Sequence, residues 1–383
     1  MITKKYLPNG NKTGEKMRVL MGPGPSDVPQ RVLTALAQPT IGHLDPEFIS
    51  MMEEIKELLQ YAFQTKNKLT FPVSAPGSAG METCFVNLVE PGDKVLVAIN
   101  GVFGMRMVEN VERARGIAIT IKEEWGKPVD PIKVEEALKE DPEIKILAFV
   151  HAETSTGALS DAKTLSEIAI KYNALTIVDA VTSLGGSPLK VDEWKLDAVY
   201  SGTQKCLSCI PGISPVTFSD KAVAAIKNRK SKVQSWFLDL NLVMGYWDTN
   251  SKRSYHHTAP VNSMYALLES LRMLKEEGLE NAWKRHTKNH LILKEGLEKL
   301  GFEFIVDEKF RLPQLNAVKL PEWIDDAKAR AYALENHQLE IGGGFGPLAG
   351  KIWRVGLMGC SSSQKNIDLF LDVLNNIKTA HLK

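Results

Sequence analysis

Six short apolar runs alternate with amphipathic stretches between residues 94 and 218, and this alternation restricts the possible folds more than any other feature. Several runs are apolar throughout, as strands are when helices cover both faces of their sheet. The alternation is typical of an α/β domain with a largely parallel sheet, whose ligands bind beyond the carboxyl ends of the strands. The expected strands are 94–99, 117–121, 144–150, 175–180, 197–202 and 213–218, and the expected helices between them are 78–90, 104–115, 132–139, 160–172 and 221–228.

The C-terminal third has a different pattern, which begins near Pro260. Two long helical patterns, 263–277 and 280–300, precede shorter apolar runs and a final helix at 367–379. Residues 1–16 are polar and without periodicity, which is typical of an extended arm. We therefore predict an arm at 1–16, a large domain at 17–262 and a smaller C-terminal α+β domain at 263–383.

The charge balance excludes some classes of partner. The chain has 47 basic and 46 acidic residues, which gives a net charge of +1. So small a charge does not favour binding to nucleic acid or to an anionic membrane. No apolar run approaches the roughly 20 residues that span a bilayer. The N-terminal segment lacks the apolar core of a secretory signal, and the last residues are not a peroxisomal address. We expect a cytoplasmic protein without nucleic-acid or membrane partners.

Four cysteines are too few for a disulfide framework in 383 residues. Cys206 and Cys209 have the spacing of half a zinc site or of a redox pair, but no second Cys or His pair accompanies them. We expect ordinary thiols and no metal, with a local disulfide as the alternative.

Two chemically complementary residues follow neighbouring expected strands. Asp179 ends the run at 175–180, and Lys205 comes just after the run at 197–202. A pyridine cofactor needs both: a carboxylate keeps its ring nitrogen protonated, and a lysine forms an imine with it and later acts as a base. Either residue alone has an ordinary explanation, a salt bridge or a turn cap. Their shared position favours the cofactor.

Three further features are suited to anions. The loop 74–80 is rich in small residues and precedes a helix, so its backbone N–H groups can approach a phosphate, although it matches neither a P-loop nor a dinucleotide fingerprint. Arg354 is the one cation in an apolar strand and suits a carboxylate, unless it is merely exposed or ion-paired. In the cluster 255–258, Tyr255 and Thr258 suit a phosphate better than the adjacent histidines suit a metal.

Together these motifs resemble the fold-type-I pyridoxal-phosphate enzymes, and most closely the class-V alanine–glyoxylate / serine–pyruvate aminotransferase family. The resemblance extends from about residue 17 to 375 in the family's order. The matching segments are MGPGPS (21–26), FQT (63–65), NG (100–101), HAETSTG (151–157), VDA (178–180), SGTQK (201–205), YHHT (255–258) and RVGL (354–357).

The resemblance implies a role for each matching residue. Lys205 holds pyridoxal 5'-phosphate as a Schiff base, and Asp179 pairs with the ring nitrogen. Arg354 holds the substrate carboxylate. The remaining positions contact cofactor or substrate: Gly77, Ser78 and Gln204 at the phosphate, Thr154 at the ring oxygen, Tyr255 and Thr258 at the phosphate of the neighbouring subunit's cofactor, and Gly24 and His43 in the substrate pocket. The family also implies a homodimer with shared active sites.

The chain departs from the family at three positions. Phe103 stands where many relatives stack a tryptophan on the cofactor ring, and a phenyl face can still stack with less area. Pro76 lies where relatives often have a hydroxyl, so one phosphate contact is lost. His43 is in a segment that varies among relatives and tunes substrate choice in a way the sequence does not specify.

The expected function is a ping-pong transamination that moves the amino group of serine or alanine to pyruvate or glyoxylate. Three alternatives stay open. The first is a ureidoglycine–glyoxylate aminotransferase. The second is a cysteine desulfurase-like lyase, for which Cys360 is the only thiol in a loose Gly/Ser-rich stretch. The third is a cofactor-free scaffold.

Overall fold

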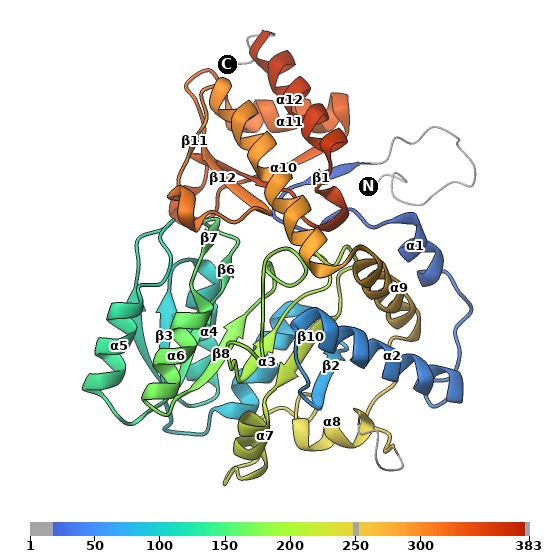
Figure 1. Ribbon diagram of the computed structural model, residues 1–383, viewed down its shortest axis with the longest axis vertical. Coiled ribbons are helices and arrows are strands. Elements are labelled where there is room, and N and C mark those ends of the chain that lie inside the picture. Colours follow the sequence, from blue (N-terminus) through green and yellow to red (C-terminus); the bar gives the residue numbers. More distant parts are fainter. Residues whose placement is uncertain (1–17, 248–252, 380–383) are drawn as a thin grey trace, which may run out of the picture.

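The computed structural model describes residues 18–247 and 253–379, and most of its strands form two sheets, one above the other in Figure 1. The larger sheet has seven strands in the order β2-β10-β9-β8-β5-β3-β4. All neighbours from β9 to β4 pair in parallel, whereas β10 runs antiparallel to both β9 and β2. The strands are β2 (Leu69–Val73), β3 (Lys94–Ile99), β4 (Ile117–Lys122), β5 (Ile144–Val150), β8 (Leu175–Asp179), β9 (Ala198–Tyr200) and β10 (Ser214–Phe218).

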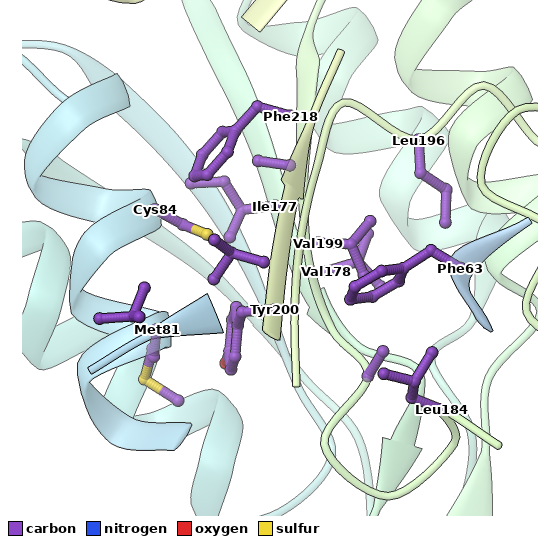
Figure 2. Close-up of a cluster of buried hydrophobic side chains, with 14 of the residues drawn as sticks. Phe63, Met81, Cys84, Ile177, Val178, Leu184, Leu196, Val199, Tyr200 and Phe218 are labelled. Atoms are coloured by element: carbon purple, nitrogen blue, oxygen red, sulfur yellow. The ribbon is translucent and has the colours of Figure 1, made fainter. Parts of the chain in front are cut away.

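Helices cover this sheet, which confirms the α/β prediction. Figure 2 shows Ile177 and Tyr200 on one side of the strands with Met81 of α3, and Val199 on the other side with Phe63 of α2. Both faces of the central strands are therefore buried and mostly apolar, whereas the edge strand β4 is partly exposed. The helices of this part are α2 (Pro46–Phe63), α3 (Gly77–Leu88), α4 (Val102–Arg113), α5 (Pro131–Glu140), α6 (Ala162–Lys171) and α7 (Asp220–Lys227).

Local sequence explains where several helices begin. Asp45 accepts a hydrogen bond from the N–H of Glu47 at 2.8 Å, with Pro46 at the first helical position of α2. Asp130 caps α5 in the same way, and Pro131 follows it. An acidic cap followed by proline is a strong start signal, because proline lacks only an N–H that would be unpaired there.

The smaller sheet has the order β1-β13-β14-β12-β11 and carries its own apolar core. Its first strand comes from the other end of the chain, because β1 pairs in parallel with β13 (Figure 1). Three helices pack beside this sheet. The elements are β1 (Val19–Met21), β11 (Glu303–Phe304), β12 (Leu315–Lys319), β13 (Leu339–Gly343), β14 (Ile352–Gly356), α10 (Leu279–Lys299), α11 (Asp326–His337) and α12 (Gln364–Thr379).

The division at residues 17–262 and 263–383 stays a prediction, and two packing contacts lie close to its boundaries. Met21 belongs to the core of the smaller sheet. Helix α9 (Val261–Glu277) packs against α1 (Gln30–Leu36) and α2, and its apolar side chains join the core of the larger sheet. Near each expected boundary, a short segment therefore packs into the core of the other domain. The arm at 1–16 lies outside the described residues.

Candidate active site

Asp179 ends β8 with its carboxylate buried under the carboxyl edge of the large sheet. Because side chains alternate along a strand, it points to the same face as Ile177. Its oxygens accept hydrogen bonds from the Val181 N–H and the Tyr200 hydroxyl, both at 2.8 Å. Burial raises the pKa of Asp179 to about 6, and these hydrogen bonds act against that rise. A cation placed beside it would favour the charged form.

Lys205 follows β9 and its Nζ donates to the carbonyl of Pro23. Ser26 ties the two segments together: its N–H donates to the Gln204 carbonyl and its hydroxyl to the Lys205 carbonyl, both at 2.8 Å. Gly24 has a φ of +108°, and a Cβ there would collide with Lys205 Nζ. Burial and the nearby charge of Arg354 together lower the pKa of Lys205 to about 8.

A cavity of about 180 Å³ opens at Lys205. Its walls come from both ends of the chain and from both sheets, so the fold, rather than one local motif, creates it. Five of the residues singled out in the sequence line this cavity together: Gly24, Phe103, Thr154, Lys205 and Arg354.

Arg354 lies on β14, and two of its three guanidinium nitrogens are hydrogen-bonded to backbone carbonyls. Nε donates to the Gly343 carbonyl at 2.8 Å, and Nη1 donates to the Thr154 carbonyl at 3.4 Å. Within the described part of the chain, Nη2 has no hydrogen-bond partner, and Phe345 covers the guanidinium with its ring centroid 5.8 Å away. The free edge of a fixed guanidinium is suited to a carboxylate.

The loop predicted to hold a phosphate leads directly into α3. Its N-cap residue is Pro76, which provides no capping side chain. The backbone N–H groups of Gly77 and Ser78, in the first turn of the helix, therefore stay free to bind an anion. Gln204 lies nearby across Gly202, and its buried Oε1 has no partner among the described residues. Ser74, which starts the loop, is hydrogen-bonded to His257 Nε2 at 2.7 Å.

Two charged residues of the site were missed in the sequence. Glu153 is completely buried beside Thr154, and burial raises its pKa to about 7. Arg106 lines the cavity, with its guanidinium 4.9 Å from the ring centroid of Phe103. The available signal was an acid directly after the apolar run 144–150 for Glu153, and an arginine one helical turn after Phe103 for Arg106.

Seven of the predicted residues do not line this cavity; Asp179, Gly77, Ser78 and Gln204 are described above, and the other three form a separate group. Tyr255 and Thr258 are exposed, with their hydroxyl oxygens 3.4 Å apart. The ring of His43 lies 5.2 Å from that of Tyr255. Their roles at the cofactor and substrate stay predictions.

All four cysteines are free thiols in the structure, so the alternative of a local disulfide is not formed. Burial raises the pKa of Cys206 and of Cys209 to about 12, which makes both unreactive near neutral pH. Cys360 lines a second cavity rather than the one at Lys205. Between residues 18 and 247 and between 253 and 379, no cluster of three or more potential metal ligands occurs. In the same residues, no helix is both long and apolar enough to cross a membrane.

Comparisons with known proteins converge on one family. The family model described as aminotransferase class-V matches residues 18–344. The alanine–glyoxylate aminotransferase of Oryctolagus cuniculus is 41% identical over 356 residues, which cover 92% of this chain and 90% of that protein. The (S)-ureidoglycine–glyoxylate transaminase of Bacillus subtilis is 36% identical, with coverage of 95% and 91%.

Solved structures give the same result. The crystal structure of an alanine–glyoxylate aminotransferase from Nostoc has a TM-score of 0.92 and 43% identity, and covers 96% of this chain and 97% of that one. The ureidoglycine–glyoxylate aminotransferase of Bacillus subtilis has a TM-score of 0.94 and 37% identity, with coverage of 97% and 96%. The predicted resemblance is confirmed.

Proposed function

The chain belongs to the class-V aminotransferase family, and from this premise we propose that it moves the amino group of alanine or serine to glyoxylate or pyruvate. One observation carries the proposal. The amine of Lys205 and the half-free guanidinium of Arg354 line the same small cavity, with the carboxylate of Asp179 buried beside it. An amino acid placed there has a group for its carboxylate and a group for its Cα proton.

Pyridoxal phosphate is the cofactor that the family implies, and the residues present fit it. Asp179 would hold the pyridine nitrogen, and Lys205 would hold the aldehyde carbon. The uncapped N–H groups of Gly77 and Ser78 would hold the phosphate, and the side-chain NH2 of Gln204 would donate a further hydrogen bond to it. When bound, the cofactor supplies an electron sink that lets a proton leave the substrate Cα.

In this proposal Lys205 moves the proton and Arg354 positions the substrate. Burial and the charge of Arg354 keep the pKa of Lys205 at about 8, so a useful fraction of the amine is neutral near pH 7 and can accept a proton. Arg354 fixes the substrate carboxylate through its free edge. The ring of Phe103 closes one wall of the cavity and excludes water from the reacting atoms.

The size of the cavity favours small substrates. About 180 Å³ lies between Phe103, Phe345, Lys205 and Arg354. So small a space is suited to amino acids with short side chains, such as alanine and serine. Glyoxylate and pyruvate have keto-acid side chains of this size or smaller.

The assembly and location belong to the same proposal. We infer a homodimer in which Tyr255 and Thr258, exposed in one chain, reach the phosphate of the partner's cofactor. Two large apolar rings, Trp236 and Tyr255, are more than 60% exposed on this surface, and a second copy would cover them. A cytoplasmic location remains a prediction from the sequence.

A desulfurase is the less favoured alternative. That reaction needs a reactive thiol that reaches the substrate. Among the described residues, no cysteine lines the cavity at Lys205. Cys360 is held by a hydrogen bond from its Sγ to the Asp27 carbonyl at 3.1 Å.

A panel of amino donors tests the proposal. The holoenzyme is mixed with single amino acids in the absence of a keto acid, and the loss of its visible cofactor absorbance is timed. We expect alanine and serine to react fastest, and glyoxylate or pyruvate to restore the spectrum. Ureidoglycine as the one fast donor would favour the alternative transaminase, and release of sulfide from cysteine would contradict both.

A further inference from the structure

Glu153 is a completely buried carboxyl that the proposed reaction does not use. It ends the short strand β6 (Ala152–Glu153), which pairs with β7 (Ala158–Leu159). Gly101 leaves room for it, because a Cβ at Gly101 would collide with the Glu153 carboxyl carbon. Such a close fit to a glycine indicates that the carboxyl has a fixed position.

The two oxygens of Glu153 have different surroundings. Oε1 accepts hydrogen bonds from the Ser155 N–H at 2.9 Å and the Ser155 hydroxyl at 2.6 Å. Oε2 is buried and accepts no hydrogen bond of ordinary geometry among the described residues, although the Phe103 N–H lies close enough to the carboxyl to favour its ionised form. A buried ionised oxygen without a partner is costly, whereas a protonated oxygen avoids the charge. Proton binding at Oε2 leaves both Ser155 hydrogen bonds intact.

Ser155 connects this carboxyl to the wall of the active site. Its hydroxyl oxygen also accepts a hydrogen bond from the Val102 N–H at 3.1 Å, at the N-terminus of α4. Helix α4 has no capping side chain of its own at Gly101, and it carries Phe103 into the cavity. Glu153 therefore supports the element that shapes the cavity.

Several charged or titratable groups act on Glu153. Asp179 on β8 repels its ionised form and Arg354 on β14 attracts it, while the Tyr200 hydroxyl on β9 also lies within electrostatic range. Lys205 and Arg106 line the adjoining cavity. Burial and then Asp179 raise the pKa of Glu153 to about 7, and the Ser155 hydrogen bonds limit the rise. Its charge therefore changes near neutral pH.

We propose that Glu153 is a positioning residue that takes up a proton when a substrate carboxylate binds to Arg354. An ionised Glu153 attracts the guanidinium and repels the incoming carboxylate. A neutral Glu153 leaves Arg354 to the substrate. Because linkage is reciprocal, carboxylate binding must then favour the protonated form of Glu153. The inference rests on the proposed function, in which Arg354 is the carboxylate site.

The test measures proton uptake rather than turnover. The holoenzyme is titrated calorimetrically with propionate, a small monocarboxylate that cannot react, in two buffers with different ionisation heats. At pH 8 we expect proton uptake by the wild type, and less uptake by Glu153→Gln, which keeps the acceptor for Ser155 and cannot ionise. Any proton taken up at the Lys205 nitrogen is read separately from the visible absorbance. Equal uptake in the two proteins would overturn the inference.

The affinity for propionate gives a second readout. Between pH 6 and pH 9 we expect binding to the wild type to weaken roughly fivefold or more, in the usual range of coupling between two sites, and Glu153→Gln to lose most of this change. If that variant does not fold, Ser155→Ala replaces it. Removing a hydrogen bond that lowers the pKa of Glu153 should move the loss of affinity to higher pH. An unmoved profile would contradict the inference.

Arg354→Gln separates the two claims. If propionate binds this variant as tightly as the wild type, Arg354 is not the carboxylate site and the proposed function fails in that respect. If binding depends on Arg354 but Glu153 takes up no proton, only the present inference fails.

Discussion

At the scale of single residues, the site consists of buried groups that change each other's charge. Asp179, Glu153 and Lys205 all have pKa values moved toward neutrality by burial, to about 6, 7 and 8. Titratable groups displaced in this way gather at functional sites, because catalysis near pH 7 needs groups that can both hold and release protons. Here Arg354 is the charge that acts on both Glu153 and Lys205.

The effect of Arg354 on the pKa of Lys205 predicts how the rate at which the cofactor-free protein binds pyridoxal phosphate depends on pH. The neutral amine is the nucleophile, so the capture rate should rise with pH through a midpoint near 8. In Arg354→Gln the positive charge that disfavours protonated Lys205 is gone, the pKa of Lys205 rises, and the midpoint should move to higher pH. Stopped-flow absorbance measures both profiles. A midpoint that stays in place would show that the two residues are not coupled.

Some residues of the site could be predicted from the sequence, and others could not. Asp179 and Lys205 follow strongly apolar strands, whose ends are easy to locate, and parallel strands bring such ends to one edge. Glu153 ends a strand of only two residues, which no periodicity reveals. Its burial depends on Gly101, which is distant in sequence and leaves the space that the carboxyl fills. Packing between residues that are distant in the sequence cannot be predicted from a local sequence pattern.

At the scale of elements, six of the seven strands of the large sheet were predicted to within about two residues, because their runs are mainly apolar and most of them are buried on both faces. Elements with weak patterns were missed. Helix α11 has a mostly polar sequence with two buried alanines, and β13 ends in two glycines. Strand β1 has only three residues, and its place beside β13 depends on tertiary contacts.

The N-terminus of α3 allows a prediction about one loop residue. Pro76 has φ −65° and ψ 168°, which serine adopts without strain, so Pro76→Ser should provide both a helix cap and a phosphate contact. A hydrogen bond to a charged group contributes about 1.5–3 kcal/mol, so the cofactor should bind about tenfold more tightly. The new cap stabilises the folded protein, whereas the loss of proline makes the unfolded chain more flexible and destabilises the fold. The free energy of unfolding should therefore change by less than about 1 kcal/mol.

Ser219→Ala is the matched control for this experiment. Ser219 caps α7 by accepting from the Ala222 N–H at 3.1 Å, away from the cavity. This variant should lose about 1 kcal/mol of stability and keep its cofactor affinity. Fluorescence titration with pyridoxal phosphate compares the variants. An unchanged affinity in Pro76→Ser would place the phosphate elsewhere.

At the scale of the whole molecule, the cavity exists only where the two sheets meet. Asp179 and Lys205 follow strands of the large sheet, whereas Arg354 belongs to the small one, and the segment at Gly24 connects them after β1. A relative shift of the two sheets would therefore change the distance between the proton-moving and the carboxylate-holding groups.

The proposed dimer predicts that two inactive variants restore each other. In a hybrid of Lys205→Ala and Tyr255→Ala subunits, one site keeps its own Lys205 and receives Tyr255 from the other chain. Co-expressed subunits, purified through two different tags, should recover activity well above either parent. If Tyr255 served the site of its own chain, the hybrid would stay as inactive as the parents, and the shared-site proposal would fail.

The central claim is that Lys205 carries the cofactor and moves the proton in a transaminase. The holoenzyme is reduced with borohydride, digested and mapped by mass spectrometry, with the exposed Lys163→Ala as the control for loss of a lysine. We predict that the cofactor mass is found on the peptide with Lys205, and that Lys205→Ala loses the label, the visible absorbance and turnover, while Lys163→Ala keeps all three. A label on another lysine, or transamination by Lys205→Ala, would contradict the account.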